Sequence, residues 1–327
     1  MTVLVTGGAG YIGSHVVHGL VDRGEHVVVL DNLATGFRAA VPGAAHLVVG
    51  DVGDGDLVGT LIAEHRIDTI MHFAASTVVP ESVAHPAAYY LNNTAGSLVL
   101  FDAAARAGIR HVVFSSTAAV YGSPARQPVV ESEPPAPLSP YGTSKWVTEM
   151  MLRDIAAATP FTFVALRYFN VAGADPGGRT GQSTRAATHL VKAAVQAVLG
   201  IRAGLEIYGT DYPTPDGTCV RDYIHVTDLA AAHLAALDHL RAGGASATLN
   251  CGYGHGYSVR QVVDAVKRVS GGDFPTADRP RRPGDPASIV ADTRAIRQAL
   301  AWVPAHDNLD AIVRDALAWE RRLAAQG

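Results

Sequence analysis

A glycine-rich turn between an apolar run and a helix-forming stretch constrains the fold of this chain more than any other feature. Residues 3–5 are apolar, and glycines follow at positions 7, 10 and 13. Gly7 permits a tight turn, Gly10 lets the backbone approach a pyrophosphate, and Gly13 lets helix and strand pack closely. The helix N-terminus behind such a turn offers N–H groups and a positive dipole to phosphates. The pattern is typical of the first strand–turn–helix unit of a dinucleotide-binding domain.

An acidic residue after the second apolar run supports this interpretation. Residues 27–30 lead into Asp31, 18 residues after Gly13. A carboxylate there accepts hydrogen bonds from the adenosine ribose and repels a 2′-phosphate, so NAD is favoured over NADP. Two alternatives stay open at this point. Asp31 could merely cap a loop, and Arg38 nearby could favour NADP.

Short apolar runs alternate with helix-length stretches through the first half of the chain. This alternation predicts an α/β fold with a doubly wound parallel sheet of the Rossmann kind, covered by helices on both faces. The predicted strands lie at residues 3–5, 27–30, 47–49, 69–71, 112–114 and 163–166. The predicted helices between them include residues 15–23, 56–65 and 92–107.

The sequence pattern changes after residue 170, where Gly/Pro-rich loops separate the predicted helices. A chain of 327 residues is long for one core. We therefore predict an NAD-binding domain over residues 1–170 and a smaller α/β substrate domain over residues 171–327, with some segments returning to pack on the first. The predicted helices in the second part lie at residues 186–199, 259–269, 292–300 and 309–323.

Composition excludes several classes of protein. The net charge of -4 and the absence of a basic run argue against a nucleic-acid partner. No apolar stretch reaches about 18 residues, and no signal sequence follows Met1, so we expect no membrane span and a cytoplasmic protein. The two cysteines, Cys219 and Cys251, are too few for a disulfide framework, and no histidine pair has metal-ligand spacing. We therefore expect no metal.

A tyrosine and a lysine four residues apart form the candidate catalytic pair. If Tyr141 opens a helix, Lys145 lies on the same face. Lowering a tyrosine pKa from near 10 by about 3 units takes roughly 4 kcal/mol. One cation about 4 Å away supplies that much at an effective dielectric constant near 20. Lys145 and a nicotinamide cation could share this task, which would make Tyr141 a base at neutral pH. Such pairs also occur by chance, and the glycine turn is what favours the catalytic interpretation here.

A hydroxyl-rich segment ends the strand at residues 112–114. Ser115 and Ser116 lead to Thr117 at the carboxyl edge of the sheet, where doubly wound folds bind ligands. Thr117 could donate to a substrate oxygen and orient it against Tyr141. The alternative is that the three hydroxyls are only the entry to a loop.

Seven segments resemble the UDP-glucose 4-epimerase family, also called the UDP-galactose 4-epimerases, and together they span almost the whole chain. The most specific segment covers residues 211–230, because the broader short-chain dehydrogenase superfamily does not share it. The segments read VTGGAGYIGSHV (5–16), DNLATG (31–36), HFAAS (72–76), FSSTAAVYG (114–122), SPYGTSK (139–145), RYFNVAGADP (167–176) and DYPTPDGTCVRDYIHVTDLA (211–230).

The resemblance implies an NAD that stays bound and is reduced and reoxidised within one turnover. It implies cofactor contacts from Gly7, Gly10, Tyr11, Ile12, Gly13, Asp31, Asn32, Asp51, Val52, Phe73, Ala74, Ala75, Thr77, Asn92, Tyr141, Lys145 and Phe169. It implies UDP-sugar contacts from Thr117, Asn170, His189, Tyr208, Arg221, Arg282, Asp285 and Ile289. It also implies a homodimer formed through the helices that begin near Asn92 and Tyr141.

Two positions depart from the family pattern. Thr117 stands where many members have serine, which keeps the hydroxyl and adds a methyl group. Thr188 and His189 stand where some members carry an asparagine pair. The contact of His189 with the substrate diphosphate therefore competes with a role as a helix-surface residue.

The implied reaction is reversible epimerisation at C4 of UDP-galactose and UDP-glucose. Tyr141 as phenolate takes the 4-hydroxyl proton while C4 passes hydride to NAD, and the 4-keto sugar turns over and takes the hydride back on its other face. The alternatives are epimerisation or decarboxylation of UDP-glucuronate and a non-catalytic NAD sensor. A 4,6-dehydratase is disfavoured because Thr117 is followed by Ala118, Ala119 and Val120, where dehydratases carry acids.

One residue bears on sugar specificity. Ile289 falls where some family members place a tyrosine whose ring limits the space beside C2 of the hexose. Isoleucine is shorter, so the sequence predicts that a C2 acetamido group is admitted and that UDP-N-acetylhexosamines are also substrates. The alternative is that Ile289 only packs in the core of the second domain.

Overall fold

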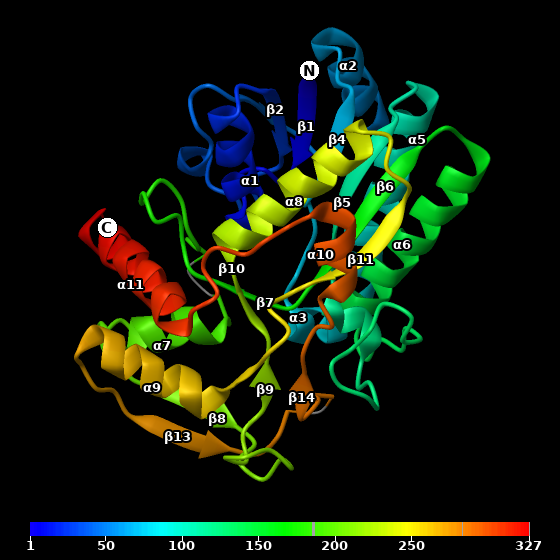
Figure 1. The fold of residues 1–327 in the computed structure, drawn as a ribbon. Helices are drawn as coiled ribbons and strands as arrows, with labels where there is room; N and C mark the ends of the chain where they lie inside the picture. Colours follow the sequence, from blue (N-terminus) through cyan, green and yellow to red (C-terminus); the bar gives the residue numbers. More distant parts are fainter. Residues whose placement is uncertain (185–186, 283, 327) are drawn as a thin grey trace.

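A seven-stranded parallel sheet forms the centre of the molecule (Figure 1). The computed structural model describes residues 1–184, 187–282 and 284–326. The strand order is β11-β6-β5-β4-β1-β2-β3, so the predicted doubly wound fold is confirmed. All six predicted strands are present, and β11 joins them as a seventh. They are β1 (Thr2–Thr6), β2 (His26–Asp31), β3 (His46–Val49), β4 (Thr69–His72), β5 (His111–Thr117), β6 (Thr162–Tyr168) and β11 (Ala247–Cys251).

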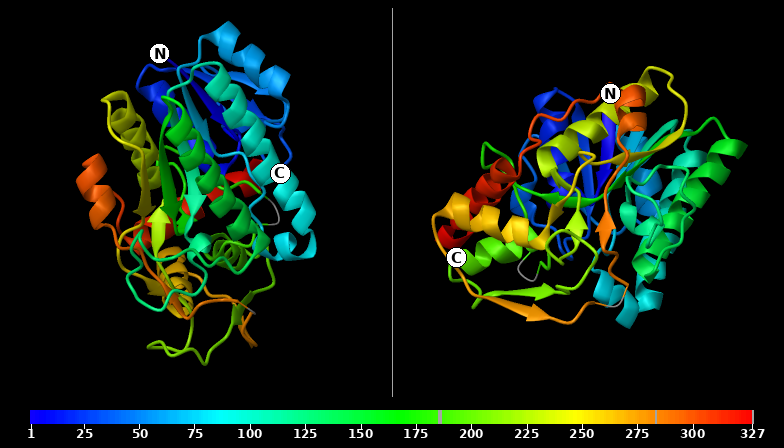
Figure 2. Two further views of the ribbon diagram at one scale, coloured as in Figure 1. Left: turned by 90° about the vertical axis from the view of Figure 1, so that its right-hand side faces the viewer. Right: turned by 60° about the horizontal axis from the view of Figure 1, so that its bottom comes forward.

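Helices cover both faces of this sheet, which explains why its strands read as continuous apolar runs. Alternate side chains of β1 enter different cores: Val3 and Val5 pack with α1 (Tyr11–Asp22) and α8 (Val226–Arg241). Leu4 packs on the other face with α2 (Gly55–His65), α5 (Gly96–Arg106) and α6 (Pro140–Ala158). Figure 2 shows these two helix layers from further sides.

The helix predicted over residues 92–107 has an unexpected first part. Residues Tyr90–Ala95 form a π-helical turn, and the α-helix α5 begins only at Gly96. Hydroxyl groups of Ser97 and Thr148 both donate to the carbonyl oxygen of Asn93. Apolar periodicity cannot reveal such a local change of helix type, which is frequent at functional sites.

The described residues of the C-terminal part add three small sheets and, besides α8, three longer helices. The sheets pair β7 (Asn170–Ala172) with β10 (Tyr223–His225), β8 (Leu205–Tyr208) with β13 (Thr276–Arg279), and β9 (Val220–Arg221) with β12 (Tyr257–Ser258) and β14 (Ser288–Ile289). The helices are α7 (Leu190–Val198), α9 (Val259–Ser270) and α11 (Leu309–Gln326), and the short α10 (Arg294–Leu300) packs on α8 and β11. The helix predicted from residue 186 begins at Leu190, and residues 185–186 lie outside the described part.

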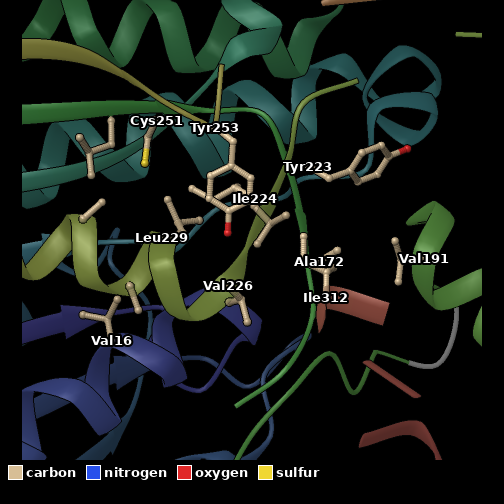
Figure 3. Packing of buried hydrophobic residues seen from close by; sticks show 14 of the residues in the cluster. Val16, Ala172, Val191, Tyr223, Ile224, Val226, Leu229, Cys251, Tyr253 and Ile312 are labelled. Atoms are coloured by element: carbon tan, nitrogen blue, oxygen red, sulfur yellow. The ribbon is translucent and has the colours of Figure 1, made fainter. Parts of the chain in front are cut away.

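One apolar core joins the C-terminal part to the sheet (Figure 3). Val16 of α1, Leu229 of α8, Val191 of α7 and Ile312 of α11 belong to the same buried cluster. The strand β11 also pairs with β6 over five residues. A domain boundary at residues 170/171 stays a prediction, because core and sheet both continue across it.

Two further properties concern the described residues. None of their helices combines the length and the hydropathy that crossing a membrane requires. No group of three or more histidine, cysteine, aspartate or glutamate side chains is placed among them to hold a metal ion.

Candidate functional site

The glycine turn has the geometry that its spacing predicts. Gly7 has a φ of +69°, and a Cβ atom there would lie 2.5 Å from the backbone nitrogen of Ala74. A Cβ atom on Gly13 would lie 2.2 Å from the carbonyl oxygen of Gly7. Gly10 is the N-cap of α1 and contributes no side-chain cap. Among the described residues, nothing accepts the first N–H groups of α1, so they are free to bind phosphate.

Acidic side chains lie beside this turn at the ends of β2 and β3. The Asp31 carboxylate accepts the N–H of Ala9 at 2.9 Å and the N–H of Leu33 at 2.8 Å. Asn32 donates to the Asp51 carboxylate at 3.1 Å. Asp31 therefore does cap its own loop, and a carboxylate keeps further acceptor positions for ribose hydroxyls. The two interpretations of Asp31 are compatible.

The three candidate catalytic residues meet at the carboxyl end of β5. Thr117 is the last residue of β5, while Tyr141 and Lys145 occupy the first two turns of α6. Ser139 caps this helix by accepting the N–H of Gly142 at 3.2 Å, and Pro140 occupies its first turn. Tyr141 and Lys145 thus share one helix face, as their spacing predicts.

Burial dominates the protonation of this group. It raises the pKa of Tyr141, and a side-chain hydrogen bond with Thr117 opposes that effect. Burial lowers the pKa of Lys145 to about 7, and the charge of Glu149 opposes that effect. The Lys145 ammonium donates to the carbonyl oxygen of Ser115 at 3.0 Å. In the protein alone, Tyr141 is therefore a neutral phenol, and the expected lowering of its pKa requires a further positive charge.

The segment after β4 covers the glycine turn and contains residues that the resemblance implies as cofactor contacts. Phe73 follows β4 and packs 4.7 Å from the ring of His233, and Ala74 contacts Gly7. Asn92 donates to the Ser76 hydroxyl at 3.0 Å. Ala75 and Thr77 flank Ser76 in this segment, and Val52 packs against Gly96 at the start of α5.

Sequence reasoning missed Asn93 and Ser76 as organisers of this segment. The Asn93 side chain accepts the Ser76 N–H at 2.8 Å and donates to the Ser76 carbonyl oxygen at 2.9 Å. It also donates to Ser144 of α6 at 3.1 Å. The signal was present, because the segment HFAAS ends in Ser76 and the polar pair at positions 92–93 interrupts an apolar stretch.

Four of the candidate UDP-binding residues form two pairs, each of which joins a strand of a small sheet to a loop residue. Arg221 of β9 donates to Asp285 at 3.3 Å. The guanidinium of Arg282 lies 3.8 Å from the ring centroid of Tyr208, which ends β8. Arginine side chains offer forked donors to phosphate, and an aromatic ring offers a surface for a base. The structure thus brings together four of the eight predicted substrate residues.

The remaining predicted substrate residues lie closer to the sheet. Asn170 begins β7, directly after the buried Phe169. Ile289 is the register partner of Arg221 and packs in one cluster with Phe169, Val120 and Tyr121. Ile289 therefore connects the Arg221 pair with the segment that follows Thr117.

His189 has different surroundings from the other candidates. It is the N-cap of α7 and lines a cavity together with Tyr11, Gln182, Lys192 and Trp319. The cavity thus combines one predicted cofactor residue with one predicted substrate residue. A role of His189 in binding diphosphate stays a prediction.

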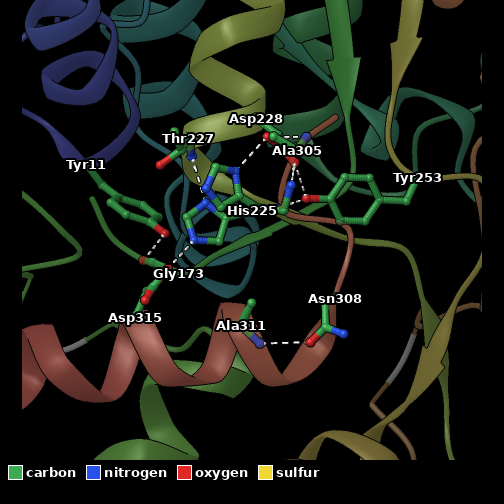
Figure 4. A network of polar contacts seen from close by, with 11 residues as sticks. Tyr11, Gly173, His225, Thr227, Asp228, Tyr253, Ala305, Asn308, Ala311 and Asp315 are labelled. Carbon is green, nitrogen blue, oxygen red and sulfur yellow. Dashed lines mark hydrogen bonds and ion pairs between the residues drawn. The ribbon is translucent and has the colours of Figure 1, made fainter. Parts of the chain in front are cut away.

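A polar network ties the nucleotide turn to the C-terminal part (Figure 4). The Tyr11 hydroxyl donates to the carbonyl oxygen of Gly173 at 2.7 Å. Nδ1 of His225 accepts the N–H of Thr227 at 3.0 Å, so its Nε2 carries the proton and faces Asp315 of α11 at 3.2 Å. The two parts of the site are therefore held together by directed bonds as well as by the shared core.

Comparisons with known proteins agree with this geometry. A model of the NAD dependent epimerase/dehydratase family matches residues 3–252. The UDP-glucose 4-epimerase of Azospirillum brasilense is 60% identical over 321 residues, which are 98% of this chain and 92% of that relative. The solved UDP-glucose 4-epimerase of Brucella ovis in complex with NAD superimposes with a TM-score of 0.94 at 44% identity and covers 97% of each chain.

A second solved structure has a broader description. The UDP-Glc/GlcNAc 4-epimerase of Campylobacter jejuni superimposes with a TM-score of 0.86 at 43% identity, over 98% of this chain and 99% of that one. The family match covers the glycine turn and the catalytic residues, and the identities to these relatives extend over at least 97% of the chain. This chain belongs to the NAD-dependent epimerase/dehydratase family, and its resemblance to the UDP-glucose 4-epimerases is confirmed.

Proposed function

We propose that this protein is an isomerase that interconverts UDP-galactose and UDP-glucose by inverting C4 with the help of bound NAD. The observation that carries the proposal is the meeting of Thr117, Tyr141 and Lys145 at the edge of the sheet that also holds the glycine turn. The 60% identity to a UDP-glucose 4-epimerase over 98% of the chain supports it.

The residues of the chain fit NAD well. The close approach of Gly7, Gly13 and Ala74 leaves an uncapped helix end beside an ordered Asp31 carboxylate, which suits a pyrophosphate and a ribose without 2′-phosphate. When bound, NAD would supply the hydride acceptor and a positive pyridinium charge.

The protein supplies the acid–base chemistry and the orientation. Tyr141 accepts the proton of the 4-hydroxyl group and returns it after inversion, while Thr117 hydrogen-bonds the same oxygen. Lys145, held by the Ser115 carbonyl, favours the phenolate of Tyr141 electrostatically. Burial of all three groups excludes water from the reacting oxygen.

Inversion requires that the protein hold UDP firmly and the sugar loosely. Arg221 and Arg282 suit the diphosphate, and Tyr208 suits uracil, so the anchors concentrate on the part of the substrate that does not react. The keto sugar can then turn about its link to the diphosphate and present its other face to the cofactor.

An assay without added cofactor tests the proposal. Purified protein incubated with UDP-galactose should yield UDP-glucose, because the NAD that it needs comes through purification bound to the protein. No product from UDP-galactose would refute the proposal, and turnover of UDP-glucuronate alone would favour the uronate alternative.

We also propose that the protein forms a homodimer through α3 (Val79–Ala84), the π-helical turn, α5 and α6. These elements pack against one another and expose Val83, Leu91, Leu98 and Met150, with Leu91 70% exposed. A two-fold contact would bury this apolar surface. Light scattering at micromolar concentration should give twice the chain mass for the wild type and the monomer mass for Leu98→Glu. A monomeric wild type would contradict the proposal.

A further inference from the structure

A stripe of three buried side chains on α6 is bound residue by residue to the end of β5. Tyr141, Lys145 and Glu149 follow one another at intervals of four and therefore share one helix face. Tyr141 bonds to the Thr117 side chain, and Lys145 donates to the Ser115 carbonyl oxygen at 3.0 Å. Ser116 stands between Ser115 and Thr117 in the strand, and its hydroxyl donates to the Glu149 carboxylate at 2.5 Å. Glu149 is thus part of the same interface as the catalytic pair.

Arg167 fixes the orientation of the Glu149 carboxylate. It lies opposite Ser116 in the register of β5 and β6. Two nitrogens of its guanidinium donate to the Glu149 carboxylate, Nε at 2.9 Å and Nη2 at 2.6 Å. The remaining nitrogen donates to the Tyr121 hydroxyl at 2.8 Å. Glu149 is fully buried and Arg167 is 3% exposed.

A buried ion pair of this kind is a poor way to stabilise a fold. Its desolvation penalty cancels much of the attraction, and apolar side chains of similar volume often stabilise as well or better. Apolar side chains occupy nearby positions of the same helix and of β6, since Leu152 and Ala165 are fully buried in one adjoining apolar cluster. A charge at position 149 therefore calls for a role other than stability.

The neighbourhood of Lys145 gives that role. Among the described residues, the one hydrogen-bond acceptor of its ammonium is the neutral Ser115 carbonyl, and the Phe114 ring lies 4.8 Å away. Burial lowers the pKa of Lys145 to about 7, and Glu149 opposes this. The other titratable or charged groups around the stripe include His72 of β4, Tyr89 of α4 (Pro86–Tyr89), Tyr121 of η3 (Ala118–Tyr121), and Arg167 and Tyr168 of β6. They also include Arg153, which donates to the Glu149 carbonyl oxygen at 3.4 Å, and Glu131, whose carbonyl oxygen accepts from Arg167 at 3.3 Å. Among the described residues, Glu149 is the anion whose charge opposes the effect of burial on Lys145.

We propose that Glu149 is a positioning residue for the reaction, which keeps Lys145 as an ammonium behind Tyr141, and that Arg167 serves by holding Glu149 in place. The proposal rests on the proposed epimerase function. When Tyr141 and Lys145 have lost one proton between them, the pair is either a phenolate with an ammonium or a phenol with a neutral amine. A carboxylate nearer to lysine favours the arrangement of phenolate and ammonium over that of phenol and amine.

The three lysines of the chain allow a direct measurement of this effect. They are Lys145, Lys192 and Lys267, so a protein labelled with 13C at the lysine ε-carbons gives three signals. Lys145→Arg identifies the signal of Lys145. We expect its titration midpoint in the NAD-bound protein to fall by about one pH unit or more in Glu149→Gln. Lys192, which is bound to Glu320 far from this stripe, serves as the internal control and should not move.

The activity should follow the same direction. Loss of a negative charge lowers the pKa of Lys145, so the alkaline limb of kcat should move to lower pH in Glu149→Gln. The KM for UDP-galactose should stay within about twofold, since Glu149 does not face the substrate anchors. Glu149→Asp keeps the negative charge, so the alkaline limb of kcat should lie close to that of the wild type. A purely structural role of Glu149 would not predict this recovery.

A folding defect can be separated from the proposed effect. If unpaired Arg167 destabilises Glu149→Gln, the double variant Glu149→Gln/Arg167→Met removes the ion pair as a unit. It should move the Lys145 midpoint in the same direction but by less, because a positive charge is lost together with the negative one. An unchanged Lys145 midpoint in a folded, NAD-bound variant would overturn the proposal. Because that midpoint is measured without turnover, it remains informative even if UDP-galactose proves not to be the substrate.

Discussion

Tyr141 and Lys145 are buried at the N-terminal end of a 19-residue helix, beside the end of a seven-residue strand. The candidate UDP anchors stand on strands of two to four residues (Tyr208 and Arg221) or in a loop (Arg282 and Asp285) and remain partly open to solvent. The catalytic residues bond to main-chain and hydroxyl groups that cannot move independently of the sheet. The anchors bond mainly to each other, as Arg221 does to Asp285 and Arg282 to Tyr208.

The contrast follows from what each region must do. Proton transfer requires atoms that are held to within a fraction of an ångström, which regular elements provide. Binding a charged nucleotide requires side chains that exchange one partner for another, so exposed ion pairs of small net energy are suitable. The two regions should therefore respond differently to substitution.

Removal of the Tyr141 hydroxyl should have the largest effect. Tyr141→Phe should lower kcat at least about a hundredfold, because it removes the group that we propose moves the proton, and Lys145→Ala should do likewise. Bound NAD should remain in Tyr141→Phe, as measured by acid release and chromatography. Tyr90→Phe removes an exposed phenol and is the matched control. Turnover like that of the wild type in Tyr141→Phe would exclude Tyr141 from the mechanism.

A side-chain atom added inside the glycine turn should abolish retention of the cofactor. Gly13→Ala places a Cβ atom 2.2 Å from the Gly7 carbonyl oxygen, so the turn must open and the phosphate site is lost. We expect about one NAD per chain in the wild type and less than a tenth of that in the variant. Gly59→Ala is the control, because a Cβ atom there meets nothing within 4 Å. NADP in place of NAD in the wild type would refute our interpretation of Asp31.

Substitution of an anchor should change binding and leave the chemistry intact. Arg221→Ala or Arg282→Ala should raise KM for UDP-galactose by about 10- to 100-fold, the effect of a lost charged hydrogen bond, with kcat nearly unchanged. Arg294→Ala removes an exposed arginine that pairs with Asp292 and should have no effect. A loss confined to kcat would contradict the separation of the two regions.

The smallest effect is expected where the two regions touch. Ile289 packs against Phe169 and Tyr121, so both earlier interpretations, sugar specificity and core packing, remain tenable. We predict that the wild type interconverts UDP-N-acetylglucosamine and UDP-N-acetylgalactosamine and that Ile289→Tyr slows this by about fivefold or more, about 1 kcal/mol. UDP-galactose turnover should survive. A wild type that leaves the acetamido sugars unchanged would disprove the prediction.

Local patterns were enough to predict the sheet and the catalytic group. The spacing of Gly7 and Gly13 and the interval between Tyr141 and Lys145 depend on backbone geometry that repeats in every α/β protein. The pairs Arg221–Asp285 and Tyr208–Arg282 join residues more than 60 positions apart, so only the family resemblance pointed to them. Asn93 and Glu149 were missed because burial turns ordinary polar residues into organising ones, and burial is a property of the whole fold.

A cytoplasmic location stays a prediction.

The late strand β11 has a consequence for synthesis of the chain. Its partner β6 ends at Tyr168, yet β11 spans Ala247–Cys251. While the ribosome makes the residues between them, on the order of ten seconds at usual elongation rates, β6 is an open edge with unpaired N–H and C=O groups. During that interval the nascent chain presents a template for strand pairing with neighbouring nascent chains on the same messenger. A ribosomal pause between residues 168 and 247 would therefore lower the yield of folded enzyme without changing a single contact in the finished molecule.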